Sequence, residues 1–409
     1  MRIATLQIAA KLGDVEGNIR RADEVLANAV LKVNGRSPGQ KTSAKIEEAG
    51  LDMLVLSEMA LTGYNFPSLD AVKPYVELAG KGRTAAWARE TARRLHCIVC
   101  VGYPEIEITK PEVGEEEEEE GESQQENYYN SLLIISPSGS ILHNYRKTFL
   151  YYTDETWASE GSAELGCRNL TLPLPSPASK YLREVPEPQV IDKSLSIGTR
   201  EISTTFGICM DINPYRFEAP YSAFEFAHRV LDSHSELVIV SMAWLTLLTR
   251  EELDALRGKP EMDTFNYWIQ RFLPLIRERI AYSSNPDKDY TTKSPTDGGE
   301  NGLEEKRIIL VFANRAGEED GIPLARYAGT SAIIAVSQRQ HTPSTTTNLL
   351  RTDNGLSEGE EDDKQKQADS DFDVRILCWG MLGATSEGVC FADTAGEPEM
   401  VFQLVRKAG

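Results

Sequence analysis

Three chemically reactive side chains each stand at the end of a short apolar run of the sequence. Glu58 ends the run DMLVLSE, Lys147 follows SILHNYR, and Cys209 follows TTFGI. In sheets covered by helices, groups at the carboxyl ends of strands project into a shared crevice where ligands bind. We therefore expect a carboxylate, an ammonium and a thiol to meet in one site, although they lie far apart in the chain.

This combination of groups suits the hydrolysis of an amide bond. An amide needs a strong nucleophile, a proton carrier for the departing nitrogen, and a positive partner for the tetrahedral oxyanion. We assign these roles to Cys209, Glu58 and Lys147, with the backbone N–H of Met210 as a second oxyanion donor. Taken singly, each side chain also fits an ordinary role, as a core thiol, a solvated strand end or a surface cation.

Short apolar runs alternate with helical patterns and predict the elements that position these residues. The expected strands are 2–9, 52–58, 97–103, 131–137, 204–211, 236–244, 307–315 and 331–337, with closing strands at 374–382 and 387–394. Amphipathic stretches at 17–33 and 83–96 predict helices, and in the second the buried face holds Ala85, Ala88, Ala92 and Leu95. This alternation predicts an α/β fold with helices covering the sheets, and no linker divides residues 1–409 into separate domains.

Several blocks of the sequence resemble the successive signatures of the carbon–nitrogen hydrolase, or nitrilase, superfamily. The blocks are RIATLQIAAKLGDVEGNIRRADEVL, LVLSEMALTGYNF, HNYRKTFL and FGICMDINPYRF, followed by FANRAGEE and YAGTSAII. The resemblance runs from residue 2 to about residue 337 and resumes after residue 373. It implies a four-layer αββα sandwich without a cofactor, and its Glu–Lys–Cys order matches Glu58, Lys147 and Cys209.

Within this superfamily, EMALTGYNF, YRKTFLYYTDETWASEG and GICMDINPYRFEAP look like the branch that acts on protein N-termini. The resemblance implies deamidation of an N-terminal Asn or Gln to Asp or Glu with release of ammonia, a step that precedes arginylation in N-degron degradation. The implied partners are peptides or proteins with an N-terminal Asn or Gln, and the implied assembly is a monomer or homodimer.

An N-terminal substrate carries an α-ammonium close to the scissile amide, so its pocket should offer a further acid. Asp211 is our first candidate, because on an extended strand end it would face the same side as Cys209. A turn aspartate is the equally weighted alternative. Glu155 should lie near Lys147 and orient it, unless it is an exposed loop carboxylate. Tyr64 and Trp244 follow strand ends and should line the pocket, although aromatic residues are also common in cores.

The net charge of −20 is concentrated in two polar segments. Residues 105–126 hold eleven acids and one lysine, a net of −10, and residues 353–373 hold nine acids and two lysines, a net of −7. The remaining chain is therefore close to neutral and lacks the basic surface that nucleic acid requires. We expect loop insertions at about 105–127, 283–306 and 338–373, and a Pro-rich excursion at 171–190. The alternative function for the acidic insertions is docking of a partner.

Cysteine usage indicates a reducing, intracellular setting, in the cytoplasm or the nucleus. Cys97 and Cys100 form a C-x-x-C, but within a strand their side chains should point to opposite faces, which favours core packing over a metal or redox site. The five histidines have no metal-ligand spacing, so we expect no metal. The sequence contains neither a secretory signal nor an apolar run of membrane-spanning length.

Three other functions remain open on the sequence alone. A nitrilase-type enzyme acting on a small free amide, nitrile or ureido acid would use the same triad, with an arginine in the pocket for a free carboxylate. A papain-like Cys–His pair would need a placed histidine, and His96, His143 and His228 fit no such motif. An inactive scaffold would bind partners through the acidic insertions and would have no use for the three reactive residues.

Overall fold

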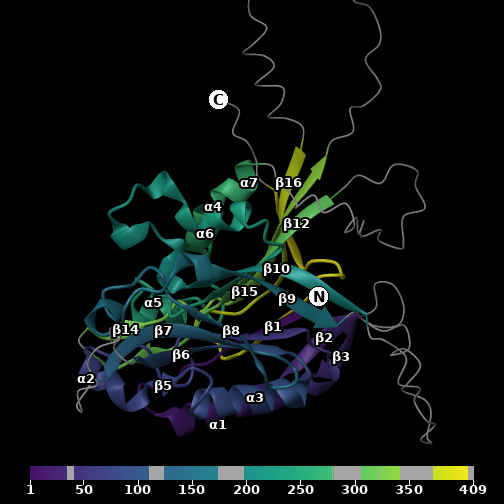
Figure 1. Ribbon diagram of the computed structural model, residues 1–409. Helices are drawn as coiled ribbons and strands as arrows, with labels where there is room; N and C mark the ends of the chain where they lie inside the picture. The colour runs from purple at the N-terminus through teal and green to yellow at the C-terminus, as the bar shows by residue number, and fades with distance from the viewer. Residues whose placement is uncertain are drawn as a thin grey trace, which may run out of the picture.

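The computed structural model describes residues 1–34, 41–109, 124–173, 198–278, 280, 305–321, 323–340 and 372–403. Two large mixed sheets pack face to face, with helices on both outer sides (Figure 1). This is the predicted four-layer αββα sandwich. Each predicted strand corresponds to an observed one, although the runs at 52–58 and 204–211 leave the strand before the reactive residue is reached.

The first sheet places three parallel strands at its centre. Its order is β17 (Gly388–Asp393), β1 (Arg2–Gln7), β4 (Met53–Leu56), β6 (Ile98–Thr109), β7 (Gln125–Ile135) and β8 (Ile141–Arg146), with β5 (Glu77–Leu78) also paired to β6. Strands β1, β4 and β6 run parallel, whereas the outer pairs are antiparallel. The carboxyl ends of β1 and β4 therefore lie at one edge of this sheet.

The second sheet repeats this arrangement. Its order is β18 (Met400–Gln403), β16 (Phe372–Met381), β15 (Ala332–Gln340), β12 (Glu305–Ala313), β11 (Leu237–Ser241), β10 (Thr199–Ile208) and β9 (Cys167–Pro173). Strands β10, β11 and β12 are parallel. The Ser241 hydroxyl at the end of β11 donates to the Leu56 carbonyl at the end of β4 (2.9 Å), so the ends of the two parallel sets meet.

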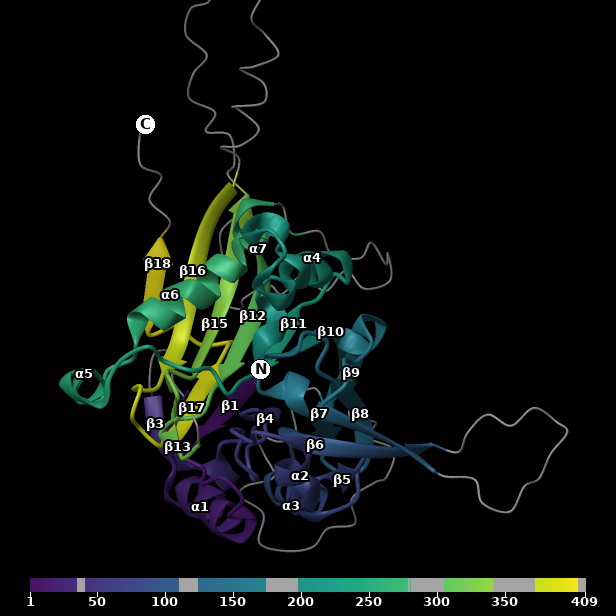
Figure 2. The same ribbon diagram turned by 90° about the vertical axis from the view of Figure 1, so that its left-hand side faces the viewer.

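Helices complete the outer layers, and each covers its sheet through one apolar face. Helices α1 (Val15–Asn28) and α3 (Arg83–Leu95) cover the first sheet, and α4 (Glu225–Asp232), α6 (Met262–Arg271) and α7 (Leu273–Arg277) cover the second (Figure 2). The predicted face of α3 is buried, as expected. The shorter α2 (Leu69–Val72) and α5 (Arg250–Ala255) lie in connecting segments. None of the described helices is long and apolar enough to cross a membrane.

The amphipathic stretch at 17–33 is only partly helical. Helix α1 begins at Val15, where the Asp14 side chain accepts the Gly17 N–H, and ends at Asn28. The chain then forms a hairpin of β2 (Val30–Asn34) and β3 (Lys41–Lys45). The β-branched and apolar residues at the end of the predicted helix favour a strand, so this part of the prediction was wrong. A second small hairpin joins β13 (Glu318–Glu319) and β14 (Ala325–Arg326).

The predicted insertions are shorter than expected where their ends can be described. Strand β6 continues to Thr109, strand β7 begins at Gln125, and strand β12 begins at Glu305. Strand β15 continues to Gln340, and β16 begins at Phe372. The prediction assigned these strand ends to loops because they are polar. Alternating polar and apolar residues are also compatible with two antiparallel strands that are exposed on one face. The rest of the predicted insertions, and most of 171–190, lies outside the described residues, and the single-domain organisation stays a prediction.

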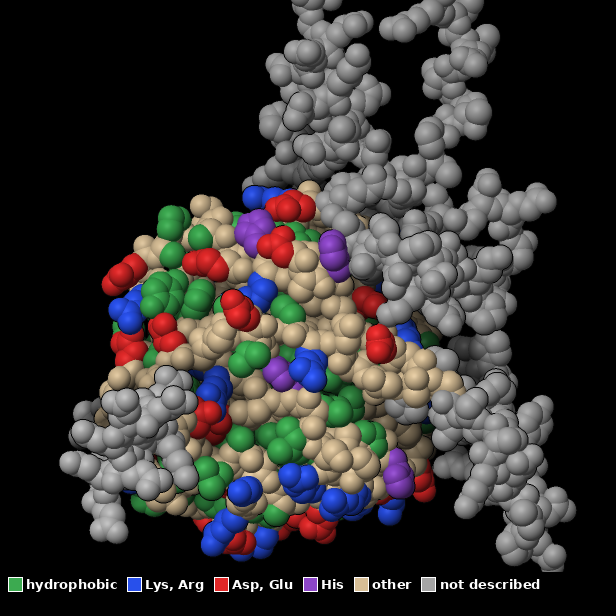
Figure 3. Space-filling view, in the orientation of Figure 1, with side chains coloured by type: hydrophobic (Ala, Val, Ile, Leu, Met, Phe, Trp, Pro, Cys, Tyr) green, Lys and Arg blue, Asp and Glu red, His purple; other side chains and the backbone are tan. Residues whose placement is uncertain are grey.

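Charged side chains on the described surface are mixed in sign. Lys and Arg gather along the lower edge in Figure 3, over α1 and α3, with acids among them. Arg83 pairs there with Glu16 (2.8 Å) and Arg94 with Glu47 (2.9 Å). Such a surface differs from the continuous basic face that contacts phosphate backbones.

Cys97 and Cys100 lie on opposite faces of the first sheet, as predicted. Cys97 packs in the core between this sheet and α1 and α3, and Cys100 packs in the core between the two sheets. Burial raises the pKa of Cys97 to about 12 and that of Cys100 beyond its ordinary range. Neither thiol is placed to act with the other.

Gly102 in β6 lies close to the backbone that carries Glu58. A Cβ at Gly102 would lie 2.6 Å from the Met59 nitrogen and 2.7 Å from the Glu58 Cα. The Gly102 carbonyl also accepts the Ala60 N–H (3.1 Å). The absence of a side chain here therefore fixes how β6 and the segment after β4 pack together.

We predict that Gly102→Ala lowers the free energy of unfolding by about 1–3 kcal/mol, because the added methyl displaces backbone rather than a flexible side chain. Urea denaturation measures this change. Gly388→Ala is the matched control, since its Cβ would meet only Leu382 at an ordinary 3.6 Å. Equal unfolding midpoints for the two variants would contradict the prediction.

Candidate active site

Glu58 lies two residues beyond β4 and is completely buried. Its Oε1 accepts hydrogen bonds from Lys147 Nζ (2.6 Å) and Asn130 Nδ2 (2.7 Å), and its Oε2 accepts the Ala243 N–H (2.7 Å). Burial raises the pKa of Glu58, and nearby Asp154 raises it further, whereas Lys147 opposes the shift. The result is a carboxylate held in place but easier to protonate than one in water.

Lys147 directly follows β8 and is likewise completely buried. Its ammonium donates to Glu58 Oε1 and to Asp154 Oδ2, each at 2.6 Å. Burial alone would lower its pKa, but Asp154 and Glu58 outweigh burial and raise the pKa above the ordinary lysine value. Lys147 is therefore charged, and two of its three N–H donors are occupied by carboxylates.

The acid that orients Lys147 is Asp154 rather than the predicted Glu155. Asp154 is buried, and besides Lys147 it accepts hydrogen bonds from Asn130 Nδ2 (2.9 Å) and the Tyr151 N–H (3.0 Å). Glu155 is exposed. Both residues belong to a single 3-10 turn, Asp154–Thr156, in which adjacent side chains point in different directions. The prediction named the right turn but the wrong carboxylate.

Cys209 directly follows β10 in a left-handed backbone conformation, with φ of 41°. It opens the 3-10 turn Cys209–Ile212, so the chain bends sharply at the predicted nucleophile instead of continuing as a strand. Such a conformation costs a non-glycine residue about 1–2 kcal/mol and is typical of functional sites. Cys209 is partly exposed, in contrast to the buried carboxylates beside it.

The electrostatic environment of Cys209 links it to the other predicted residues. Burial raises the pKa of the thiol, and Glu58 raises it further, whereas Lys147 and the Ala243 N–H lower it. In turn, Cys209 contributes to the raised pKa of Lys147. The structure thus brings Glu58, Lys147 and Cys209 together, although their catalytic roles stay a prediction.

Asp211 does not face the pocket as an open acid. Its Oδ1 accepts the N–H groups of Thr148 (3.0 Å) and Phe149 (2.7 Å) and the Thr148 hydroxyl (2.7 Å). Its Oδ2 accepts the Tyr145 hydroxyl (2.8 Å) and the Ile208 N–H (2.7 Å). Because every bond is internal and the side chain is buried, Asp211 is a structural turn residue and our first assignment was wrong.

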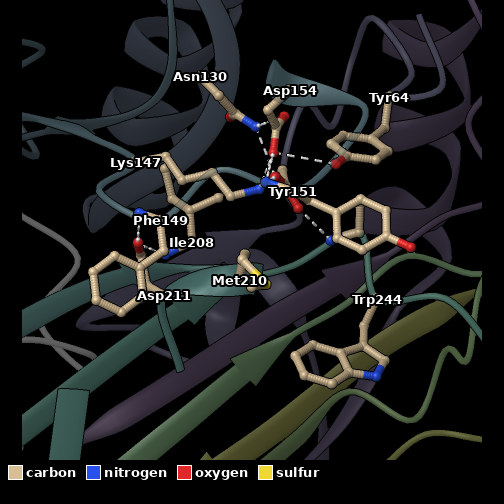
Figure 4. Close-up of polar contacts among 12 residues, drawn as sticks. Tyr64, Asn130, Lys147, Phe149, Tyr151, Asp154, Ile208, Met210, Asp211 and Trp244 are labelled. Carbon is tan, nitrogen blue, oxygen red and sulfur yellow. Dashed lines mark hydrogen bonds and ion pairs between the residues drawn. The ribbon is translucent and has the colours of Figure 1, made fainter. Parts of the chain in front are cut away.

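Figure 4 shows that Asp211 lies between Phe149 and Ile208 and is connected to both. Thr148 and Phe149 directly follow Lys147, and Ile208 directly precedes Cys209. By accepting hydrogen bonds from both segments, Asp211 joins the loop that carries the ammonium to the turn that carries the thiol. The expectation of an extended backbone failed because the strand ends one residue before Cys209.

Tyr64 and Tyr151 lie against the polar cluster, whereas the assignment of Trp244 to the pocket wall stays a prediction. Tyr64 is buried, its hydroxyl donates to Asp154 Oδ2 (3.3 Å), and its ring lies 5.6 Å from Lys147 Nζ. Trp244 is half-buried and packs on Tyr267, with ring centroids 5.6 Å apart. Tyr151, which the sequence did not single out, lies beside Lys147 and Asp154 in Figure 4. Met210 is buried, and its assignment as an oxyanion donor stays a prediction.

The loop that holds Tyr64 is fixed by the small β13–β14 hairpin, which lies between β12 and β15 in the chain. Glu319 accepts the N–H groups of Tyr64 and Asn65 (each 2.9 Å at Oε2) and the Tyr327 hydroxyl (2.6 Å). Arg315 pairs with Glu319 and lies 4.6 Å from the Tyr327 ring centre. The blocks FANRAGEE and YAGTSAII thus support the segment after Glu58 rather than supply reacting groups.

Sequence reasoning missed Asn130 and the backbone amide of Ala243. Asn130 is completely buried in β7 and donates to both Glu58 and Asp154. An asparagine at the start of the apolar run SLLIIS was a usable signal, because a buried amide needs polar partners. The role of the Ala243 amide cannot be predicted from the pattern of side chains, because the donor is a backbone group. Within the described residues, no group of His, Cys, Asp or Glu could hold a metal ion.

Comparison with known proteins agrees with this geometry. The model of the carbon–nitrogen hydrolase family matches residues 2–212, a segment that contains Glu58, Lys147 and Cys209. The chain belongs to the carbon–nitrogen hydrolase family.

More specific similarities point to one branch of this family. The chain is 24% identical to the protein N-terminal amidase of Saccharomyces cerevisiae, over 97% of this chain and 95% of that protein. It is 27% identical to the protein N-terminal amidase of Schizosaccharomyces pombe, over 83% of this chain and 92% of that protein. A crystal structure of an N-terminal amidase with a Gln-Val peptide has the same fold, with a TM-score of 0.60 at 20% identity and 99% coverage of both chains.

We predict that Asp211→Asn lowers the free energy of unfolding by about 2–4 kcal/mol, because an amide nitrogen would face N–H donors that are buried. Equilibrium urea denaturation measures the change. Glu218→Gln is the control, as it alters an exposed carboxylate seven residues away and should stay within about 0.5 kcal/mol of the parent. An unchanged midpoint for Asp211→Asn would show that its hydrogen bonds are dispensable.

Proposed function

We propose that this protein is an amidase that converts an N-terminal Asn or Gln of a peptide or protein to Asp or Glu, with release of ammonia. The observation that carries the proposal is the buried set of Glu58, Lys147 and Asp154 beside Cys209. Similarity to N-terminal amidases over nearly the full chain supports the substrate class. The proposal includes an intracellular location and a monomeric or homodimeric state.

In the first half of the reaction, Cys209 attacks the side-chain amide carbon. Because the pKa of its thiol is raised, Cys209 rests as the neutral thiol and requires a base at the moment of attack. Glu58 accepts the proton as the sulfur–carbon bond forms. The oxyanion is held by the free N–H donor of Lys147 and the Met210 amide, and each such donor contributes about 3 kcal/mol to catalysis. Glu58 then passes the proton to the nitrogen, and ammonia leaves a thioester.

In the second half, water replaces ammonia. Glu58 takes a proton from water as its oxygen bonds to the thioester carbon, and Lys147 again holds the oxyanion. Collapse breaks the sulfur–carbon bond, and the proton returns from Glu58 to Cys209. The raised pKa of Glu58 suits this work, because the group must both accept and release a proton in each half.

The charge of the site favours a substrate with a free α-ammonium. Glu58 and Asp154 carry two negative charges against one positive charge on Lys147, so the buried set has an excess of one negative charge. An ammonium a few ångströms away is attracted at low effective dielectric. Asp211, whose hydrogen bonds are all internal, is not proposed as its partner. A small free acid would be repelled by the same charge.

We expect ammonia release from peptides that begin with Asn or Gln. The rate for their N-acetylated forms should be lower by about a hundredfold or more. An enzyme-coupled ammonia assay measures both. Cys209→Ser, with its fold verified by circular dichroism, should show no measurable turnover. Equal rates for free and acetylated peptides would favour a nitrilase-type enzyme for small amides, and full activity of Cys209→Ser would exclude a thioester.

The adjacent carboxylates Asp154 and Glu155 should differ in their effect on activity. Asp154→Asn should lower kcat by about tenfold or more, because Lys147 loses one of its two anchors. It should also shift the acidic limb of the kcat/KM profile to lower pH, since Asp154 raises the pKa of Glu58 and its removal lets Glu58 ionise more easily. Glu155→Gln changes an exposed group and should leave the profile in place. A shift with Glu155→Gln instead would reverse our assignment.

A further inference from the structure

The hydrogen bond from the Ala243 amide connects Glu58 to the second sheet (2.7 Å). Ala243 lies two residues beyond β11, and the paired residues of β11 and β12 end at Ser241 and Ala313. A backbone N–H has no rotamer of its own, so its direction follows from the residues on either side. The contacts that hold the neighbours of Ala243 therefore decide whether its N–H reaches Glu58.

Asn314, directly after β12, holds the residue that follows Ala243. Its side chain is completely buried, its Oδ1 accepts the Trp244 N–H (2.8 Å), and its Nδ2 donates to the Gly329 carbonyl (2.9 Å). The same Nδ2 lies 3.4 Å from the Trp244 carbonyl oxygen. These partners fix the orientation of the amide, because exchanging its oxygen and nitrogen would place N–H against N–H.

The direction of the Ala243 N–H follows from this arrangement. The Met242 N–H donates to the Ala313 carbonyl (2.8 Å), and the Trp244 N–H donates to Asn314, so both point toward the end of β12. In a strand, amides two residues apart point to the same side and the amide between them points to the other. The Ala243 N–H accordingly points away from β12, where Glu58 Oε2 accepts it.

Asn314 is itself held by side chains from both sheets. The Ser331 hydroxyl, just before β15, accepts the Asn314 N–H (3.0 Å) and lies 2.7 Å from Gln7 Oε1. Gln7, the last residue of β1, accepts the Ser331 N–H (2.9 Å) and donates to the carbonyls of Gly383 (2.9 Å) and Ser386 (2.6 Å). Asn314, Ser331 and Gln7 are all buried. They fix Trp244 to the ends of β1 and β12.

We propose that Asn314 is a positioning residue, which holds the Ala243 amide against the Glu58 carboxylate. This inference rests on the proposed function, in which Glu58 moves the protons. The side chain of Asn314 binds the backbone of Trp244 and Gly329, so its effect on Glu58 passes through the Ala243 amide.

The Ala243 N–H stabilises the ionised forms of two reacting groups. Burial raises the pKa of Glu58 and that of the Cys209 thiol, and the Ala243 N–H opposes the rise in both. Loss of this donor should therefore raise the pKa of Glu58 further. The other titratable groups that face Glu58 stay in place, namely Lys147 after β8, Asp154 in the turn that follows, Cys209 after β10, Tyr64 after β4 and Tyr327 after β14.

The test compares Asn314→Ala with Gln338→Ala. Gln338 in β15 is the matched control, because its buried amide also accepts one backbone N–H and donates to two carbonyls. These partners lie in and after α7 and are Ile280 (3.0 Å), Leu275 (3.0 Å) and Glu278 (2.7 Å). Both variants should lower the urea midpoint of unfolding. Stability alone therefore does not separate them.

Only Asn314→Ala should change the kinetics. The acidic limb of its kcat/KM profile should move to higher pH by about 0.5 unit or more, because Glu58 ionises later without the Ala243 donor. Its kcat should fall by about tenfold. The shift is opposite in direction to the one expected for Asp154→Asn. Ser331→Ala removes the hydroxyl that accepts the Asn314 N–H, and it should shift the limb less in the same direction if Asn314→Ala does not fold.

Hydrogen–deuterium exchange, followed by mass spectrometry, tests the positioning without turnover. Amides of residues 242–245 should exchange about tenfold faster or more in Asn314→Ala, and at the parent rate in Gln338→Ala. Unchanged exchange in Asn314→Ala, or an acidic limb that stays in place in both Asn314→Ala and Ser331→Ala, would overturn the positioning role while the amidase function stands. An equal shift in Gln338→Ala would overturn it as well.

If the unmodified enzyme releases no ammonia from any peptide that begins with Asn or Gln, the proposed function fails. The exchange rates then still decide whether Asn314 holds the Ala243 amide, so the two failures are distinguishable.

Discussion

A single buried ammonium sets the conditions that the rest of the site must meet. Lys147 is inaccessible to solvent and lies between Glu58 and Asp154, so its charge is stabilised mainly by these two carboxylates. Burying an ion without partners is prohibitively costly, and removing one partner leaves an uncompensated charge. The two carboxylates in turn depend on Asn130, which donates to both. The four side chains therefore form one unit.

The sandwich architecture makes this unit possible. The segments after β4 and β8 come from the first sheet, and those after β10 and β11 come from the second. The Ser241–Leu56 hydrogen bond joins the sheets at the strand ends, and Asp211 joins the Lys147 loop to the Cys209 turn. Each reactive group thus stands directly after, or two residues after, a strand, and the connection that follows β8 supplies Asp154.

The sequence was sufficient for the layers of the fold and for the three reactive residues. Apolar runs of several residues indicate buried strands, and ionisable or nucleophilic side chains at the ends of these runs can be recognised in the sequence. The sequence was insufficient where the direction of a side chain depends on the geometry of a local turn. Asp154 and Glu155 are adjacent acids in one turn, and only the turn geometry tells which of them faces Lys147. Asp211 was misassigned because the left-handed φ of Cys209 is invisible in the sequence. The hydrogen bond from the Ala243 amide depends on tertiary structure alone.

The raised pKa of Cys209 has a consequence for the chemical durability of the enzyme. Peroxides and electrophilic metabolites react with thiolates, whereas a neutral thiol is a poor target for them. Burial and the neighbouring Glu58 carboxylate keep the sulfur protonated when no substrate is present. Under the proposed mechanism, Cys209 becomes reactive only on contact with the amide, so its sulfur should be oxidised more slowly between turnovers than a permanently ionised cysteine.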